Sequence, residues 1–263
     1  MIEVRDLSFK YKVNAPLILN GLSFSVENGS ILSILGKNGV GKTTFIRCLT
    51  AEVKNYSGSI KIDDQEVRDL SVGELSKVIA VVASNNPCYQ NLSVADFLVT
   101  GFANRLTALH APNRQQYEKA CAVLEELGHV DLLNRAIFEL SSGELQIVKI
   151  ARAILQNPKI VVFDEPTSNL DIKNQLMVLN QITNLANRGY TVITTTHNPG
   201  QSIELGGWVL MMTGSTQMFG RTETILTENN LHSVYGLNVS MEQGKFRKYA
   251  TFQDDAGMHR LVY

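Results

Sequence analysis

Apolar and polar residues alternate along the first part of the chain. Within residues 2–26 the apolar side chains recur at nearly every second position: Ile2, Val4, Leu7, Phe9, Leu22, Phe24 and Val26. Successive side chains of a strand point to opposite faces, so this pattern predicts antiparallel strands with one buried face. Residues 58–62 predict a further strand after a glycine.

Other stretches are apolar without alternation, which is typical of strands buried on both faces of a parallel sheet. They lie at residues 31–35, 159–163, 190–196 and 207–213. Residues 44–50 and 172–186 carry apolar residues at helical spacing between these strands. The order of strands and helices predicts an α/β fold.

The pattern becomes helical between about residues 85 and 140. Ser93 and Asn113 each precede an amphipathic stretch in the manner of a helix N-cap, and Gly128 follows the second stretch as a stop. No run typical of a core strand occurs there. We therefore expect one domain over residues 1–263, with an inserted helical subdomain at about 85–140.

Residues 36–43 read GKNGVGKT, which matches the phosphate-loop pattern G-x-x-x-x-G-K-[ST] in full. A predicted strand precedes it and a predicted helix follows it, as this pattern requires. The glycines allow successive N–H groups to face phosphate oxygens, and Lys42 adds a positive charge. The hydroxyl of Thr43 is suited to Mg²⁺, and the N-terminus of the helix favours the same anion.

Two acids, Asp164 and Glu165, follow the apolar run at 159–163, and Pro166 ends the pattern. The carboxyl end of a parallel strand is where α/β sheets bind ligands. Asp164 is suited to hold hydrated Mg²⁺, and Glu165 is suited to polarise an attacking water as general base.

The word LSSGE at residues 140–144 predicts a helix N-terminus, because a serine precedes a glutamate and then an apolar stripe. Such an N-terminus is also an anion site. The phosphate loop, LSSGE and the acid pair occur in this order, and together they resemble the ATPase subunits of ATP-binding cassette (ABC) systems. The resemblance covers nearly the whole chain and implies a P-loop NTPase core sheet, an antiparallel β subdomain and a helical subdomain carrying LSSGE.

The resemblance implies a role for each matching position. Lys42, Glu165 and the switch histidine His197 act in catalysis, and Thr43 and Asp164 hold Mg²⁺. Tyr11 stacks on adenine, Ser141 and Gly143 contact the γ-phosphate held by a partner, and Asp171 of the D-loop crosses the dimer interface. The residues expected to contact ATP are Tyr11, Gly36, Asn38, Gly39, Gly41, Lys42, Thr43, Thr44, Ser141, Gly143 and Asp171.

Two positions depart from the family pattern. Ser84 stands where the family has the Q-loop glutamine, and it is too short to reach Mg²⁺ and a water as glutamine does; Asn85, Asn86 and Gln90 are candidate substitutes. Ser142 replaces the first glycine of the signature, which adds a side chain near the phosphate. Both changes bear on turnover rate and on coupling to a permease, and neither affects the nucleotide-binding pattern.

Composition limits the partners. The chain has 263 residues and a formal net charge of −1, so no basic field attracts nucleic acid. Its three cysteines have no metal-binding spacing, which favours a reduced, cytosolic protein. No stretch reaches the roughly 18–20 apolar residues of a membrane span. If the protein serves a membrane, another chain must supply the channel.

Two further words resemble importers of iron–siderophore, haem, cobalamin and similar metal chelates: TSNLDIKNQ at residues 167–175 and LTENNLHSVY at residues 226–235. This resemblance implies an ATPase at the cytoplasmic face of the membrane that pairs with a second ATPase subunit, expected to be an identical copy. Its other partners would be an integral membrane permease and, indirectly, an extracellular or periplasmic solute-binding protein.

Two alternatives stay open at the level of sequence. One is a soluble cassette ATPase that acts in assembly, such as iron–sulfur cluster biogenesis. The other is a subunit that binds ATP without turning it over, because of Ser84 and Ser142; the presence of Glu165 and His197 argues against it. The transported solute does not follow from these residues, since permease and binding protein determine it.

Overall fold

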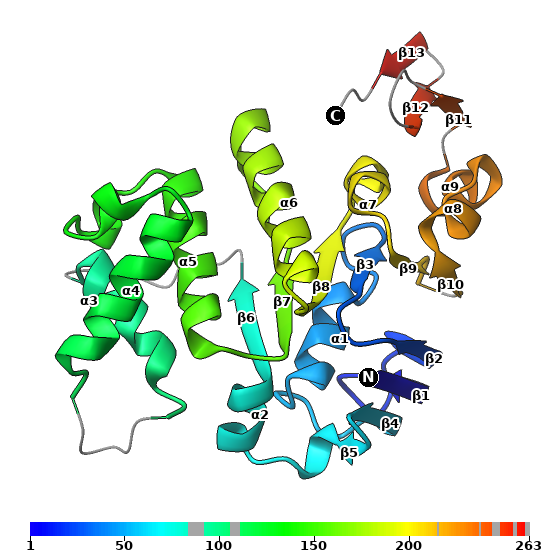
Figure 1. Ribbon diagram of the computed structural model, residues 1–263. Helices are drawn as coiled ribbons and strands as arrows, with labels where there is room; N and C mark the ends of the chain where they lie inside the picture. The colour runs from blue at the N-terminus through cyan, green and yellow to red at the C-terminus, as the bar shows by residue number, and fades with distance from the viewer. Residues whose placement is uncertain are drawn as a thin grey trace. The chain divides into compact units, whose positions relative to one another are not determined.

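The computed structural model describes residues 1–83, 92–105, 111–214, 216–236, 238–243, 248–254 and 257–260. The chain forms two compact units: Met1–Leu70 with Gln181–Tyr263, and Ser71–Asn180. Figure 1 labels the helices and strands of both units. Each unit is described on its own below.

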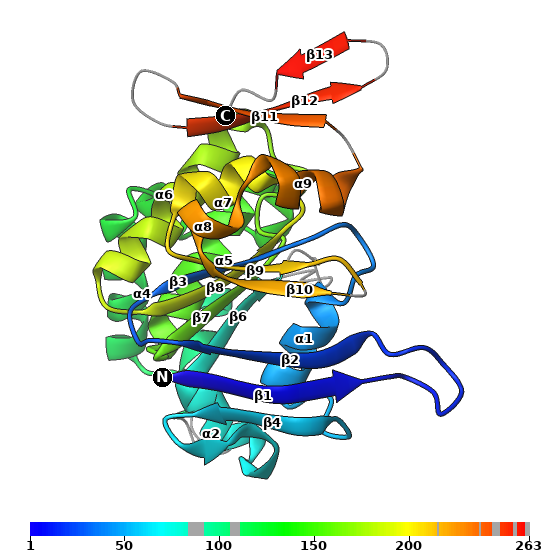
Figure 2. The same ribbon diagram turned by 90° about the vertical axis from the view of Figure 1, so that its right-hand side faces the viewer.

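The first unit contains an antiparallel sheet with strand order β2-β1-β4-β5 (Figure 2). Its strands are β1 (Ile2–Phe9), β2 (Leu19–Val26), β4 (Ser57–Ile62) and β5 (Gln65–Glu66). β1 pairs with β2 on one side and with β4 on the other. The apolar residues of the alternating pattern are buried, so the predicted antiparallel subdomain is confirmed.

The first unit also contains strands in the order β10-β9-β3-β8. They are β3 (Ile31–Leu35), β8 (Thr191–Thr196), β9 (Trp208–Met212) and β10 (Gln217–Arg221). β3 runs parallel to β8 and to β9, and every residue of β3 and β8 is buried. The unbroken apolar runs of the sequence thus correspond to central parallel strands, as predicted.

Short helices complete the first unit. They are α1 (Lys42–Leu49), the 3₁₀ turn η1 (Val67–Asp69), α7 (Pro199–Leu205), α8 (Thr222–Ile225) and α9 (Glu228–Tyr235). After α9 the chain forms a three-stranded antiparallel sheet that the sequence pattern did not predict. Its strands are β11 (Asn238–Gln243), β12 (Lys248–Asp254) and β13 (Gly257–Arg260).

The second unit joins two parallel strands to a group of helices. The strands are β6 (Ile79–Ala83) and β7 (Ile160–Asp164), which pair in parallel. The helices are α2 (Val72–Val78), α3 (Val94–Val99), α4 (Arg114–Glu126), α5 (Ser142–Gln156) and the first part of α6 (Ile172–Asn187). The 3₁₀ turns are η2 (Thr100–Phe102), η3 (Val130–Leu132) and η4 (Ile137–Glu139).

One apolar cluster holds α3, α4 and α5 together (Figure 1). Phe97 and Leu98 of α3, Leu124 of α4, and Val148 and Leu155 of α5 are buried members of it. Helices with one apolar stripe are stable only when that stripe is covered, and here each helix covers the stripes of the others.

The caps predicted at Ser93, Asn113 and Ser141 are confirmed. Asn113 and Ser141 form capping boxes at the starts of α4 and α5, and Ser93 accepts a hydrogen bond from Asp96 N at the start of α3. Ser71 forms a further capping box at the start of α2. In each of these helices the polar cap satisfies an N–H group that the first turn leaves without an intrahelical partner.

The predicted helical subdomain falls inside the second unit, and its described residues are mainly helical. Assigning residues 1–263 to a single ATPase domain stays a prediction. Ser84, together with Asn85, Asn86 and Gln90, lies outside the described residues. Among the described helices, none combines the length and the apolar character needed to cross a membrane.

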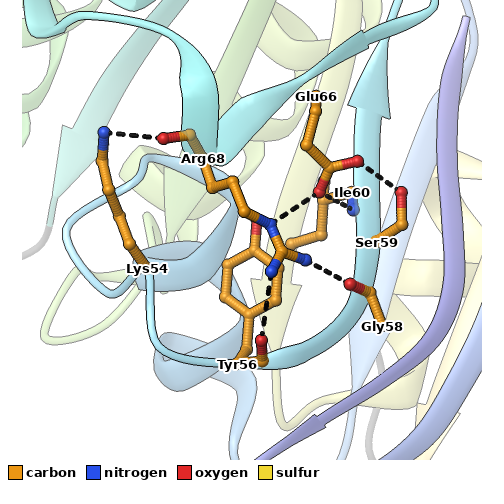
Figure 3. A network of polar contacts seen from close by, with 7 residues as sticks. All are labelled: Lys54, Tyr56, Gly58, Ser59, Ile60, Glu66 and Arg68. Carbon is orange, nitrogen blue, oxygen red and sulfur yellow. Dashed lines mark hydrogen bonds and ion pairs between the residues drawn. The ribbon is translucent and has the colours of Figure 1, made fainter.

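A polar network fastens the end of the antiparallel sheet in the first unit (Figure 3). The Arg68 guanidinium lies 4.4 Å from the centre of the Tyr56 ring and donates to Glu66 Oε1 at 3.0 Å. It also donates to the backbone carbonyls of Tyr56 and Gly58. Burial raises the pKa of Glu66, but hydrogen bonds from Ser59, Arg68 and Ile60 N outweigh it, so the pKa is lowered overall.

We expect Arg68→Met to lower the free energy of unfolding by about 1–3 kcal/mol, because several hydrogen bonds to one partly buried charge are lost while the apolar stem remains. The Glu66 contribution is present above the unfolded-state pKa and is lost as pH falls through the lowered folded-state pKa. The difference between wild type and variant should therefore shrink in acid, as urea unfolding at several pH values can measure.

Arg114→Met is the matched control, since the Arg114 side chain is 93% exposed and pairs with Glu118 one helical turn away. Exposed pairs of this kind contribute about 0.3–0.5 kcal/mol. Equal losses in the two variants would show that the network of Figure 3 adds no stability of its own.

Candidate nucleotide-binding site

The backbone between β3 and α1 follows a path that depends on glycine. Gly41, the N-cap of α1, has φ 107°, and Gly39 has φ 84°, both in the region that side chains disfavour. A Cβ on Gly41 would lie 2.9 Å from Ile18 Cγ2, and one on Gly36 would lie 2.5 Å from the Met212 carbonyl oxygen. The loop therefore approaches its neighbours at two points too closely for a larger residue.

The Lys42 side chain lies inside this loop and binds its backbone. Its Nζ donates to the carbonyl oxygens of Gly36 at 2.9 Å and Lys37 at 3.2 Å, and the residue is 5% exposed. Asn38, Gly39 and Thr43 are exposed, whereas Thr44 is buried in the first turn of α1. The ring of backbone around a cation, at the start of a helix, can bind an anion such as a phosphate.

Tyr11 lies beside this loop. Its hydroxyl is 3.2 Å from Thr44 Oγ1 and accepts a hydrogen bond from Arg47 Nη1 at 3.4 Å. The ring makes an edge contact with Phe9 and is 50% exposed. The structure thus brings Tyr11 next to the phosphate loop with part of its ring surface accessible.

His197 follows the end of β8, at the same edge as the loop. Leu35 pairs with Thr196 in register, and Gly36 N donates to Thr196 O at 3.3 Å. The phosphate loop and His197 therefore leave neighbouring parallel strands one residue beyond a paired position. The His197 residue is exposed, and its backbone carbonyl accepts a hydrogen bond from Tyr235 Oη at 2.7 Å.

In the second unit, Asp164 ends β7 and Glu165 begins the turn after it. Glu165 has φ 49°, a left-handed conformation that is uncommon for a non-glycine residue, and its carbonyl accepts from Ser168 N at 3.1 Å. Such strain is found preferentially at functional sites. The turn continues through Asn169, with φ 61°, to Asp171 at the start of α6.

The LSSGE helix begins in the same unit. The Ser141 hydroxyl accepts from Glu144 N at 3.3 Å, and Ser141 N donates to Glu144 Oε2 at 2.7 Å. Hydrogen bonds from the backbone and hydroxyl of Ser141, and then from Arg135, lower the pKa of Glu144. This carboxylate stays ionised and keeps the N-terminus of α5 fixed.

Asn174 links LSSGE to the turn before α6, a contact that sequence reasoning missed. Its N and Nδ2 donate to the two carboxylate oxygens of Asp171 at 2.8 and 3.0 Å. A Cβ on Gly143 would lie 2.5 Å from Asn174 Cγ. A larger residue at this position would therefore have to displace the Asn174 amide, whatever it contacts on a ligand.

The first unit therefore holds the phosphate loop, Tyr11 and His197 together, and the second holds the acid pair, Ser141, Gly143 and Asp171. Three contacts have no counterpart in the predicted site: Arg47 to Tyr11, Asn174 to Asp171, and Tyr235 to His197. Two of these residues lie in segments that the sequence analysis singled out: Asn174 in TSNLDIKNQ and Tyr235 at the end of LTENNLHSVY.

We expect Gly143→Ala to lower the melting temperature by a few degrees, because the new methyl group displaces the Asn174 amide and removes its bond to Asp171, worth about 1 kcal/mol. In an Asn174→Ala background the clash is absent, and the same substitution should leave the melting temperature unchanged or raise it, since alanine favours a helix more than glycine does. Thermal unfolding of the four proteins measures this coupling. Equal effects of Gly143→Ala in both backgrounds would mean that Asn174 is not what requires the glycine.

Comparison with known families identifies a relationship along most of the chain. Residues 19–168 match the family model described as ABC transporter. A Helicobacter pylori protein named "Probable iron chelatin transport ATP-binding protein" is 35% identical over 238 residues, which is 89% of this chain and 92% of the relative. The molybdate import ATP-binding protein MolC of Haemophilus influenzae is 30% identical over 248 residues, covering 94% of this chain and 92% of MolC.

Solved structures show the same fold. A structure described as a metal-chelate type ABC transporter in an inward-facing conformation matches with a TM-score of 0.84 and 30% identity, covering 96% of each chain. A dimeric bacterial ABC transporter cassette matches with a TM-score of 0.71 and 22% identity, covering 84% of this chain and 99% of that one. The α/β fold with its antiparallel subdomain is therefore the fold predicted from the sequence.

Proposed function

Since the chain belongs to the ABC transporter family of ATP-binding proteins and hydrolyses ATP, we propose that it is the ATPase subunit of an importer for a metal chelate. One observation carries the chelate class: a 35%-identical relative is named for iron chelatin transport. The likeness to a metal-chelate type transporter over 96% of the chain supports it.

The phosphate loop is the proposed site for the triphosphate of ATP. Lys42 Nζ, which donates to the Gly36 and Lys37 carbonyls, would exchange these neutral acceptors for phosphate oxygens. A hydrogen bond to a charged partner contributes about 1.5–3 kcal/mol, more than one between neutral groups. Asn38, Gly39 and Thr44 would contribute backbone contacts, and the accessible part of the Tyr11 ring would stack on adenine.

Thr43 and Asp164 are the proposed residues that hold Mg²⁺ with the nucleotide. A hydroxyl and a carboxylate are the hard oxygen donors that this ion prefers, and Thr43 is an exposed residue in the first turn of α1. When bound, Mg²⁺ neutralises charge on the phosphates. The protein's part is to supply these oxygens at the N-terminus of α1 and the end of β7.

Glu165 is the proposed general base and His197 its proposed partner at the γ-phosphate. Asp164 is the last residue of β7, and the backbone of Glu165 is left-handed with φ 49°, so the strand conformation ends between the two acids. Two adjacent acids can thus take different roles, one toward the metal and one toward the attacking water.

ATP would also join two subunits. Ser141 and Gly143 at the start of the 15-residue helix α5 are proposed to contact the γ-phosphate on a second copy, and Asp171 would cross the interface. Several charge-assisted bonds per nucleotide, made twice, would close the pair, and loss of phosphate would remove them. The pair would open again after each hydrolysis.

A permease would complete the transporter, because the described helices include none that could cross a membrane. A solute-binding protein outside the membrane would deliver the chelate, and the ATPase would lie at the cytoplasmic face. The net charge of −1 offers no attraction for nucleic acid. The alternative of a soluble assembly ATPase is disfavoured, since the relatives described above are named for transport.

We expect Glu165→Gln to lower the rate of ATP hydrolysis about 100-fold or more, because the amide cannot accept a proton from water. ATP affinity should be kept, and the variant should accumulate as an ATP-bound dimer. Phosphate release, equilibrium ATP binding and size-exclusion chromatography with Mg²⁺ and ATP measure these three properties. Glu125→Gln, at an exposed position of α4, is the control. Wild-type hydrolysis by Glu165→Gln would exclude Glu165 as the base.

Proteoliposomes containing the chain and the permease encoded beside it test the solute class. We expect ATP-dependent uptake of a ferric chelate, abolished by Glu165→Gln. Uptake of molybdate without uptake of any metal chelate would instead assign this importer to the solute named for MolC. Co-purification with soluble proteins alone would favour the assembly ATPase.

A further inference from the structure

The peptide group between His197 and Asn198 is held at both of its polar atoms. Its carbonyl oxygen, His197 O, accepts from the Tyr235 hydroxyl at 2.7 Å. Its N–H, on Asn198, donates to Thr196 Oγ1 at 3.0 Å. Because a peptide group is planar, fixing both edges fixes the direction in which the backbone leaves His197.

The partners of this peptide are themselves held in place. Thr196 Oγ1 donates to Gln201 Oε1 at 2.7 Å, within a buried pair. The Asn198 side chain accepts from Gly200 N at 2.8 Å and caps α7. One side of the switch segment is therefore fastened by residues next to it in sequence, and on the other side His197 O accepts from Tyr235, 38 positions along the chain.

Tyr235 reaches this position because it is the last residue of α9. Thr227 begins the helix by accepting from Asn230 N at 3.3 Å, and Gly236 ends it in a left-handed conformation with φ 71°. The Asn230 amide also donates to Ile225 O at 2.9 Å. These contacts give Thr227 and Asn230 of the segment 226–235, and Gly236 directly after it, a structural role in starting and ending α9.

The apolar residues of the same word anchor α9 to the central strands. Leu226, Leu231 and Val234 are buried in one cluster with Leu35 of β3 and with β9. Leu35 is the residue directly before the phosphate loop. Helix α9, whose Tyr235 bonds to His197 O, is thus packed against the end of β3, where the phosphate loop begins. Figure 2 labels α9 and β3.

We propose that Tyr235 is a positioning residue for His197, and that α9 thereby belongs to the ATP-hydrolysing machinery. The hydroxyl of Tyr235 fixes the switch peptide, and the peptide sets where the imidazole of His197 points. This inference rests on the role proposed above for His197. Burial raises the pKa of Tyr235, so the hydroxyl stays protonated and remains a donor throughout the physiological pH range.

A packing role alone predicts a different behaviour. The Tyr235 ring contributes to the cluster that holds α9, and Tyr235→Phe keeps that ring while it removes the hydroxyl. A stability effect would appear in thermal unfolding, and an effect on nucleotide binding would appear in the KM for ATP. A positioning effect appears in kcat, because only the transition state needs the histidine in its exact direction.

The experiment compares wild type, Tyr235→Phe, His197→Ala and the double variant in steady-state ATP hydrolysis. We expect Tyr235→Phe to lower kcat about two- to tenfold, the effect of one lost neutral hydrogen bond, with KM unchanged and with the melting temperature lowered by a few degrees at most, so that the protein is fully folded in the assay. In the His197→Ala background, Tyr235→Phe should cause no further loss. Tyr190→Phe, at a half-buried tyrosine of the same unit, is the control and should behave as wild type.

Each outcome has one meaning. Wild-type kcat in Tyr235→Phe, together with an impaired His197→Ala, overturns the role of Tyr235 and leaves that of His197 intact. Equal losses from Tyr235→Phe with and without the histidine also overturn it, since the hydroxyl then acts elsewhere. Wild-type kcat in His197→Ala overturns the catalytic assignment of the histidine and this inference with it. If Tyr235→Phe lowers the melting temperature enough to account for the lost activity, Tyr235 is a packing residue and the inference is wrong.

Discussion

The geometry of the nucleotide site depends on two glycines, Gly36 and Gly41, at positions where a Cβ atom would clash with neighbouring residues. Gly36 passes against the Met212 carbonyl and Gly41 passes against Ile18, so the loop is fixed at both ends by contacts that no other residue allows. With the backbone held there, Lys42 has two carbonyl acceptors within reach, and α1 begins at the same residue. Thr44 then meets the hydroxyl of Tyr11. Each part of the first unit's site follows from the course of this loop.

Local patterns in the sequence were sufficient for the elements and for the phosphate loop. Alternation placed β1 and β2, unbroken apolar runs placed β3 and β8, and caps at Ser93, Asn113 and Ser141 placed three helix starts. These signals are local, because the backbone of each element repeats over a few residues. The three strands after residue 237 were not predicted, since polar residues are mixed among their apolar ones.

Contacts between distant residues could not be predicted in the same way. Asn174 lies 31 positions after Gly143, and nothing in either neighbourhood indicates that one excludes a side chain on the other. The left-handed backbone of Glu165 is likewise invisible in the sequence, because glutamate is not a residue that favours that region. Motif recognition located the acid but not the left-handed turn that begins at it.

The segment LTENNLHSVY, which in the sequence indicated only a family resemblance, has a structural role as helix α9. Thr227, Asn230 and Gly236 form the ends of the helix, and Leu226, Leu231 and Val234 attach it to the strands. None of these contacts needs a hydroxyl on residue 235, because a phenylalanine would end the helix and pack its ring as well. The hydroxyl itself donates to His197 O. A tyrosine at this position therefore points to the switch segment, and not to the stability of α9, as the feature it serves.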